Sequence, residues 1–111
     1  TKAIKLDSNY TRAHINRGTA KFRLQDYRGA IADYSKAIDL DPNDADAYYN
    51  RGIAKSNLQD YRGAISDFTK AIEFEPNYAD AYYNRGLMKI DLLQKIKGND
   101  YGSMECYVGV A

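Results

Sequence analysis

The residues in this sequence that could act as nucleophiles, bases or metal ligands are few and scattered. The chain has one histidine, His14, and one cysteine, Cys106, and neither has a neighbouring residue that would activate it. A catalytic site needs several convergent reactive groups, and no spacing typical of a metal site occurs. We therefore expect no enzyme activity, no metal and no cofactor, and we interpret His14 as a packing residue and Cys106 as an unpaired thiol.

Amide side chains, in contrast, recur at a constant interval of 34 residues, as Asn16, Asn50 and Asn84. An asparagine amide both donates and accepts hydrogen bonds, so a row of amides can pair with the backbone of an extended peptide. Tyr49 and Tyr83 precede the last two and add flat contact area with a polar end. The residues therefore favour binding over catalysis. Hydrogen bonding between helices is an equally good explanation of the amides.

Composition and charge limit the class of partner. The chain has 111 residues and a net charge of +1, so it lacks the strong field that attracts nucleic acid or a membrane surface. No apolar stretch approaches the roughly 20 residues that cross a bilayer, and the N-terminus lacks the apolar centre of a signal peptide. We expect a soluble protein with no nucleic-acid or membrane partner. The compartment is not encoded legibly, and we favour the cytoplasm.

The interval of 34 residues organises the whole sequence. Residues 11–44 match residues 45–78 at roughly 20 of 34 positions, which is the signature of a repeat architecture. Residues 79–97 resemble the first part of this unit, and residues 1–10 resemble its end. The sequence predicts a single domain made of the second helix of a partial repeat (1–10), two complete repeats (11–44 and 45–78), the first helix of a third (79–97) and a divergent tail (98–111).

The divergent tail lacks the pattern of small and aromatic residues that the second half of each complete unit has. It contains Gly98, Gly102 and Gly109, and each glycine weakens a helix by about 1 kcal/mol relative to alanine. The tail is a degenerate helix, a cap or a segment foreign to the repeats, and the sequence leaves these three alternatives open.

Each complete unit is expected to form two helices. Apolar residues recur at steps of three and four, which places them on one helical face. In the second repeat, Asp60 is a suitable N-cap, and Pro76 ends the second helix because proline cannot continue the hydrogen-bond ladder. The buried stripe predicted for this helix comprises Ala64, Ile65, Phe68, Ala71 and Ile72. A short helix pair cannot bury its stripe alone, so successive pairs must stack.

The residues that recur at fixed places in the unit resemble the tetratricopeptide repeat (TPR). The matching residues are Tyr48 and Tyr82, Gly18, Gly52 and Gly86, Ala30 and Ala64, Tyr34 and Phe68, Ala37 and Ala71, and Pro42 and Pro76. Arg17, Arg51 and Arg85 depart from the pattern, and we interpret them as solvated charges or as charges paired between repeats. The resemblance implies an all-α fold, a right-handed α-solenoid of stacked antiparallel helix pairs.

In the TPR family, one face of the first helices lines a concave groove that binds extended peptides. The resemblance therefore implies a set of candidate groove residues, namely Asn16, Tyr49, Asn50, Ile53, Tyr83, Asn84 and Leu87. It also implies a non-enzymatic scaffold that binds a protein or peptide segment. Two alternatives stay open. The chain could be a structural, self-associating segment of a longer array, or an accessory domain of a larger enzyme.

The resemblance also restricts the ligand of this groove. Family members that bind acidic chaperone C-termini use a clamp of Lys, Asn and Arg, and the matching positions here are Ile15, Thr19, Asn50, Asp80 and Asn84. Only Asn50 fits that clamp, and the charge of Asp80 would repel a carboxylate. We therefore expect a neutral or mildly basic, partly apolar ligand and no acidic chaperone C-terminus of the clamp type. Incompletely covered repeat ends also suggest a homo-oligomer.

Overall fold

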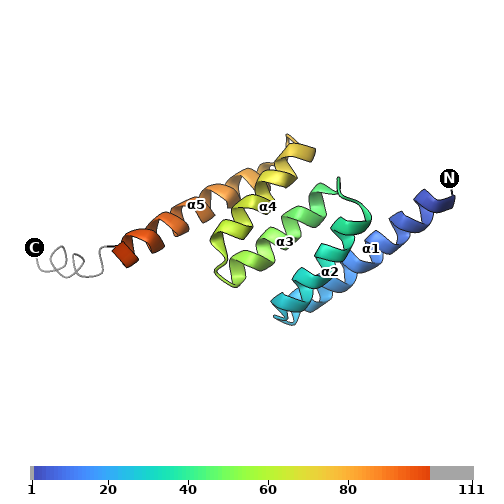
Figure 1. Ribbon diagram of the computed structural model, residues 1–111, viewed down its shortest axis with the longest axis horizontal. Coiled ribbons are helices and arrows are strands. Elements are labelled where there is room, and N and C mark those ends of the chain that lie inside the picture. The colour runs from blue at the N-terminus through green and yellow to red at the C-terminus, as the bar shows by residue number, and fades with distance from the viewer. Residues whose placement is uncertain (1, 101–111) are drawn as a thin grey trace, which may run out of the picture.

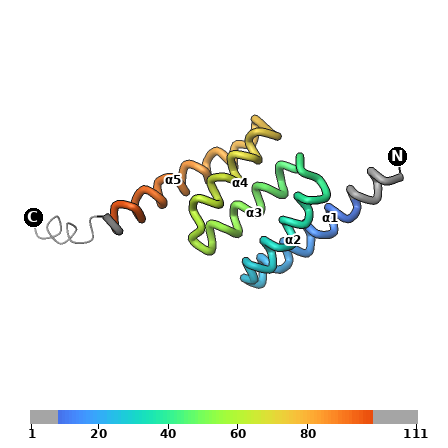
Figure 2. Tube along the Cα trace, in the orientation of Figure 1, coloured from blue at the N-terminus to red at the C-terminus, as the bar shows by residue number. Residues whose placement is uncertain are grey.

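The computed structural model describes the backbone of residues 2–100 and the side chains of residues 9–98 (Figure 2). In this part of the chain all regular structure is helical, as the sequence predicts. The helices are α1 (Lys2–Arg23), α2 (Tyr27–Leu40), α3 (Ala45–Asn57), α4 (Tyr61–Phe74) and α5 (Ala79–Asp100). Cys106 and most of the divergent tail lie outside the described residues.

The helices stack in chain order as an α-solenoid (Figure 1). Helix α1 packs on α2 and α3 packs on α4, which gives the two predicted pairs. The pairs are joined because α2 contacts α3, and α5 then packs on α4. Within residues 2–100, no helix combines the length and apolar character required to cross a bilayer.

The second helix of each pair begins and ends where the sequence predicts. Asp26 and Asp60 are the N-caps of α2 and α4, and each side chain accepts a hydrogen bond of 3.0 Å from the backbone N–H of a glycine three residues later. Helices α2 and α4 end shortly before Pro42 and Pro76. Local signals in the sequence, an N-cap aspartate and a proline, therefore set the length of these helices.

The beginning of α1 differs from the expected repeat boundary. Residues 2–10 were assigned by the repeat register to the end of a separate second helix, but α1 runs without a break from Lys2 to Arg23. The repeat register places Ser8 where Pro42 and Pro76 follow α2 and α4. Serine keeps its backbone N–H and has no ring that clashes with the preceding turn, so nothing at this position ends the helix.

Each helix pair is held at close range by a glycine that faces an aromatic ring. A Cβ atom on Gly18 would lie 2.9 Å from Tyr34, and one on Gly52 would lie 2.7 Å from Phe68. Phe68 is fully buried, and the alanines around it are buried as well. The small residues allow close helix approach while the aromatic rings fill the remaining volume.

Candidate functional site

The candidate groove residues lie on the first helices, and the structure separates them into two groups. Asn16 of α1 and Asn50 of α3 line one cavity, whereas Tyr49 of α3 and Asn84 of α5 are joined by a hydrogen bond. Ile53 lines a second cavity with Asn50. Tyr83 and Leu87 lie on α5, where their side chains are 69% and 38% exposed, and they line neither cavity.

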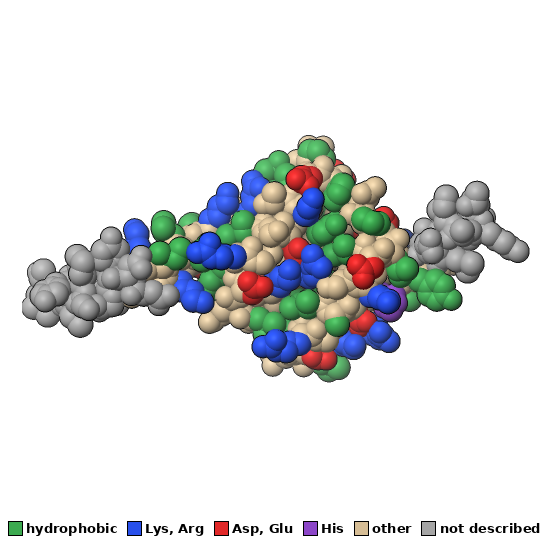
Figure 3. Space-filling model, in the orientation of Figure 1, with side chains coloured by type: hydrophobic (Ala, Val, Ile, Leu, Met, Phe, Trp, Pro, Cys, Tyr) green, Lys and Arg blue, Asp and Glu red, His purple; other side chains and the backbone are tan. Residues whose placement is uncertain are grey.

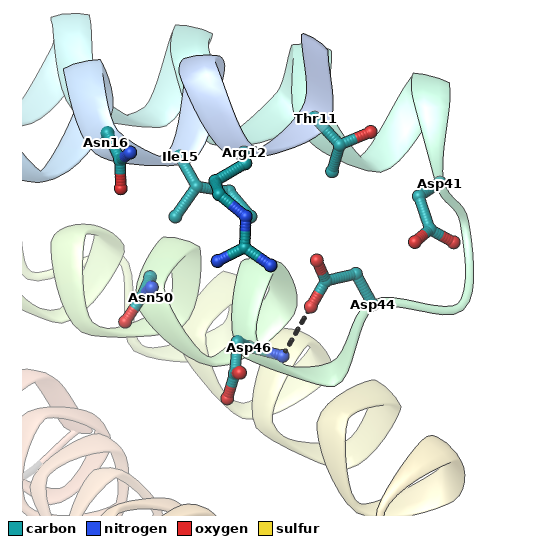
Figure 4. Close-up of a pocket in the computed structure, with 8 residues that line it drawn as sticks. All are labelled: Thr11, Arg12, Ile15, Asn16, Asp41, Asp44, Asp46 and Asn50. Carbon is teal, nitrogen blue, oxygen red and sulfur yellow. Dashed lines mark hydrogen bonds between the residues drawn. The ribbon is translucent and has the colours of Figure 1, made fainter. Parts of the chain in front are cut away.

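The first cavity, here called the acidic hollow, lies between α1, the α2–α3 connection and α3 (Figure 4). Its volume is about 300 Å³. It contains three carboxylates and one guanidinium group, so its net charge is negative. The residues that line it are Thr11, Arg12, Ile15, Asn16, Asp41, Asp44, Asp46 and Asn50.

Asp44 is the centre of this negative charge. It is the N-cap of α3, and its Oδ1 accepts hydrogen bonds from the backbone N–H groups of Asp46 and Ala47 at 3.0 and 3.3 Å. Burial raises the pKa of Asp44, the hydrogen bond from Ala47 opposes that rise, and the charges of Asp46 and Asp41 add to it. Arg12 extends from α1 toward Asp44 and Asp46 (Figure 4). A ligand cation would relieve the remaining repulsion between these carboxylates.

The second cavity, here called the apolar hollow, has a volume of about 290 Å³ and continues along α1 and α3 from the first. Phe22 and Ile53 provide its apolar surface, and Thr19, Arg23, Tyr34 and Asn50 complete it. The hydroxyl groups of Thr19 and Tyr34 share a hydrogen bond of 3.0 Å. Burial is the main cause of the raised pKa of Tyr34, which keeps its phenol neutral.

Asn50 lies at the junction, because it lines both hollows. Its side chain is half-buried, and within residues 9–98 the amides of Asn16 and Asn50 form no hydrogen bond. Both amides can therefore donate to and accept from a ligand backbone. Among residues 9–98, this part of the predicted asparagine row therefore differs from Asn84, whose amide is hydrogen-bonded.

Asn84 is in a different position, because its amide is already used inside the protein. Its Nδ2 donates to the Tyr49 hydroxyl at 3.0 Å and to the backbone carbonyl of Asp80 at 2.9 Å. The ring of Tyr49 stacks on that of Tyr78 at a centroid distance of 4.9 Å, and the Tyr78 hydroxyl donates to Asp46 at 2.7 Å. These contacts connect α3, α5 and the loop between α4 and α5.

The same tyrosines explain why the two repeats differ. The repeat register places Tyr49 and Tyr78 where Ile15 and Asp44 line the acidic hollow. Two stacked rings thus occupy, between α3 and α5, the space that remains open between α1 and α3. These two residue differences distinguish the first interface, where the acidic hollow is open, from the second, where the stacked rings take its place.

Two of the recurring arginines, Arg17 and Arg51, bind carboxylates inside the helix pairs. Arg51 binds Asp67 with Nε and Nη2 at 2.9 and 2.8 Å, and Arg17 binds Asp33 in the same way. Both carboxylates are buried and belong to the same repeat as their arginine. The predicted ion pair between repeats is therefore wrong for these two residues. The side chain of Arg17 is 62% exposed, as expected for a solvated charge, whereas that of Arg51 is 20% exposed. The second-helix aspartates are the partners because they lie opposite the arginines when the pair closes.

His14 lies beside one of these carboxylates. Its Nδ1 is 3.5 Å from Asp33 Oδ1, and the imidazole is partly buried between the helices of the first pair. The positive charges of Arg17 and Lys21 already surround Asp33. This arrangement links His14 to the packing of the helix pair. Among the residues with described side chains, no group of three His, Cys, Asp or Glu is placed to hold a metal ion.

Two acidic residues of the acidic hollow were not predicted, because the candidate groove residues were taken only from the first helix of each repeat. Asp41 and Asp44 belong to the α2–α3 connection, and a pattern restricted to first helices does not include them. The signal was present in the sequence as the acidic run of residues 39–46, DLDPNDAD. The corresponding stretch of the second repeat, EFEPNYAD, has a tyrosine in the place of Asp44.

Comparison with family models identifies sequence similarity over residues 18–78. The family description "TPR repeat" matches residues 18–59, and "Tetratricopeptide repeat" matches residues 45–78. A sequence search among curated proteins finds no match.

Similar solved structures include several TPR domains. The second TPR of Spaghetti (RPAP3), bound to the HSP90 peptide SRMEEVD, is 26% identical, with 90% of this chain and 92% of that chain aligned at a TM-score of 0.81. The Arabidopsis OM64 TPR domain is 26% identical, with coverage of 79% and 73% and a TM-score of 0.77. The TPR2AB domain of yeast Sti1 in its pHSP90 complex is 31% identical, with coverage of 76% and 33% and a TM-score of 0.74.

Proposed function

The chain belongs to the tetratricopeptide repeat family, and we propose that it is a peptide-binding module whose ligand lies along the groove between α1 and α3. The proposal rests on one observation, the two adjoining hollows that share Asn50. One hollow is acidic and the other is apolar. The ligand is an extended segment with a basic side chain next to an apolar one.

The acidic hollow selects the basic side chain. Asp41, Asp44 and Asp46 supply three carboxylates against the single charge of Arg12. A lysine or arginine of the ligand gains Coulomb attraction there, and an acidic side chain meets like charge. The pKa of Asp44 is raised because burial and the neighbouring carboxylates both disfavour its negative charge. The ligand cation offsets this cost.

The apolar hollow and Asn50 supply the remaining contacts. Phe22 and Ile53 can cover an aliphatic or aromatic side chain, with a favourable transfer of about 1.5 to 3 kcal/mol for full burial of a large one. The Asn50 amide is placed between the two side-chain sites, where it can hydrogen-bond to the ligand backbone. Asn16 extends this backbone contact along α1.

The proposed ligand differs from the acidic peptides bound by similar TPR domains. The second TPR of Spaghetti and the yeast Sti1 domain are described as complexes with HSP90 peptide or pHSP90. Those complexes support a protein or peptide partner for this chain as a class. The negative charge of the acidic hollow supports a different sequence preference, so we infer that this chain does not bind an acidic chaperone C-terminus in the same manner.

Binding of short labelled peptides measured by fluorescence anisotropy tests this function. Peptides with one Lys or Arg adjacent to a large apolar residue should bind, and SRMEEVD should not. Asn50→Ala should weaken binding by about 1 to 2 kcal/mol, because the lost hydrogen bonds belong to the complex. Asp41→Asn should weaken it as well and should reduce its salt dependence. Preferential binding of acidic peptides would contradict the proposal.

A matched control separates the hollow from the overall charge of the chain. Glu73→Gln removes one negative charge from α4, where Glu73 is exposed and, among residues 9–98, forms an ion pair with Lys70 alone, at 3.3 Å. This variant should bind the basic peptide as the unmodified chain does. An equal loss of affinity in Glu73→Gln and Asp41→Asn would show that the effect comes from net charge and not from the acidic hollow.

A further inference from the structure

Helix α5 repeats the residues with which α3 packs on α4. No described helix covers these residues of α5. Tyr82, Arg85, Gly86 and Lys89, here called the α5 docking face, stand 34 residues after Tyr48, Arg51, Gly52 and Lys55. Tyr48 is 9% exposed, whereas Tyr82 is 45% exposed. A Cβ atom on Gly52 would lie 2.7 Å from Phe68, whereas one on Gly86 would meet nothing within 4 Å.

The charges of this face show what kind of partner fits it. In the second repeat, Arg51 Nη2 and Lys55 Nζ lie 2.8 and 3.1 Å from the buried carboxylate of Asp67. Within residues 9–98, Arg85 and Lys89 have no carboxylate within ion-pair distance. The face therefore presents two cations in the arrangement that holds one aspartate elsewhere in the chain.

Arg85 is already oriented for such a contact. Its Nη1 donates to Thr69 Oγ1 at 3.3 Å, as Arg51 Nη1 donates to Ser35 Oγ at 3.1 Å. In both cases the hydroxyl belongs to the preceding second helix. The contact of Arg85 with the preceding repeat is thus formed in the same way as that of Arg51.

The two second helices of the chain define the complement of this face. Both have the sequence Ala-x-x-Asp-aromatic-x-x-Ala-Ile, at residues 30–38 and 64–72. The aspartate binds the two cations, the aromatic ring covers the glycine, and the alanines allow the helices to approach closely. At the corresponding register after α5, the sequence has Tyr101 and Gly102 instead of Asp and an aromatic residue.

We propose that the α5 docking face binds a helix of a partner protein that carries the pattern Ala-x-x-Asp-(Tyr or Phe)-x-x-Ala, seated on α5 as α4 is seated on α3. Charge complementarity favours this occupant over a second copy of α5, because two α5 faces would oppose Arg85 and Lys89 to their own counterparts. Basic and hydrophobic side chains lie side by side over α5 (Figure 3). This interaction does not depend on the ligand of the groove.

A peptide with the α4 sequence, residues 60–75, is a suitable probe. In this peptide, Ser66→Glu would supply a carboxyl group that condenses with the Lys70 amine, with loss of water, to form a side-chain lactam. Both positions are exposed on α4, so the lactam would hold the peptide helical without blocking its buried face. We expect saturable 1:1 binding to the whole chain in a fluorescence anisotropy titration. Peptides with Asp67→Asn or Phe68→Ala should bind about tenfold more weakly or less, because they lack the charge or the ring that the face requires.

Gly86→Ala tests the face on the protein side. The added methyl group meets open space in the free chain, so the variant should fold at least as well as the unmodified protein. The same methyl group would collide with the aromatic ring of a docked helix, so affinity should fall by about tenfold or more. Lys89→Gln should weaken binding several-fold, whereas Lys70→Gln on α4 should not.

Three results would overturn the proposal. The first is the absence of saturable binding up to about 1 mM peptide, which corresponds to negligible affinity. The second is equal binding to Gly86→Ala and to the unmodified chain, which would mean that the peptide binds elsewhere or displaces α4. The third is a concentration-dependent dimer in sedimentation that Gly86→Ala abolishes, because a second copy would then be the occupant. Asn50→Ala, which should weaken peptide binding in the groove between α1 and α3, should leave the affinity of the α5 docking face for the α4 peptide unchanged.

Discussion

The guanidinium group of Arg51 binds both carboxylate oxygens of Asp67, at 2.9 and 2.8 Å, and thereby joins α3 to α4 inside the helix pair. Asp67 is only 2% exposed. Asp67→Asn would leave the charges of Arg51 and Lys55 without their shared partner. We expect the free energy of unfolding to fall by about 3 kcal/mol, measured by urea denaturation. Glu73→Gln, which breaks an exposed pair, should change it by less than about 1 kcal/mol.

The corresponding aspartate of the first repeat should make stability depend on pH. The hydrogen bond from Arg17 lowers the pKa of Asp33 to about 2, although burial opposes the shift. A carboxylate with a lowered pKa stabilises the folded state fully above its ordinary pKa of 3.8, and this contribution is lost as the pH falls toward 2. The contribution is about 2 kcal/mol.

Asp33→Asn separates this contribution from other acid effects. Unfolding free energies of the variant and of the unmodified chain should differ most near pH 5 and should converge as the pH approaches 2. A difference that stays constant over this range would mean that the carboxylate titrates in the folded protein as it does in the unfolded one.

Two glycines at equivalent places in the repeat should respond oppositely to the same change. Gly52→Ala places a methyl group 2.7 Å from the ring of Phe68, which should destabilise the fold by about 1 to 3 kcal/mol. Gly86→Ala meets no atom within 4 Å and improves helix propensity, so it should stabilise by up to about 1 kcal/mol. Thermal melts of the two variants test this. Equal destabilisation would indicate that the surface of Gly86 is covered in solution.

Asn50 and Asn84 should differ in their effect on folding. Asn84→Ala removes the hydrogen bond to Tyr49 and should lower the unfolding free energy by about 1 kcal/mol. Asn50→Ala removes no hydrogen bond among the described residues and should leave stability nearly unchanged. Denaturant unfolding of both variants is the measurement. A sharp loss of stability in Asn50→Ala would mean that its amide is structural.

A glycine substitution just after α1 or α3 should stabilise the folded protein. Gln25 and Gln59 have positive φ angles of 64° and 63°, a left-handed conformation that favours glycine. Gln59 is exposed, and its side chain has no partner among residues 9–98. Gln59→Gly should raise the unfolding free energy by about 0.5 to 1 kcal/mol, because it removes the backbone strain. Gln59→Val, with a branched Cβ, should lower it.

The sequence by itself determined the helices and their order. Apolar spacing, the caps Asp26 and Asp60, and the breakers Pro42 and Pro76 are local signals that act within a few residues, so the repeat and its pairs could be predicted. The repeated Asn16 and Asn50 also indicated the face on which the hollows lie. These features depend on interactions between residues close in the sequence, and they can be recognised because they recur every 34 residues.

Tertiary structure decided which of the repeated residues share a surface. The sequence could not show that Asp67 lies opposite Arg51, or that Asn84 is bound to Tyr49. Nor could it show that two stacked tyrosines occupy the place in the second interface that corresponds to the acidic hollow of the first. It also could not show that Gly86 faces open space where Gly52 meets a ring. Equivalent positions in a repeat have the same local propensities, and their contacts differ because packing depends on which helix comes next and on the side chains it brings.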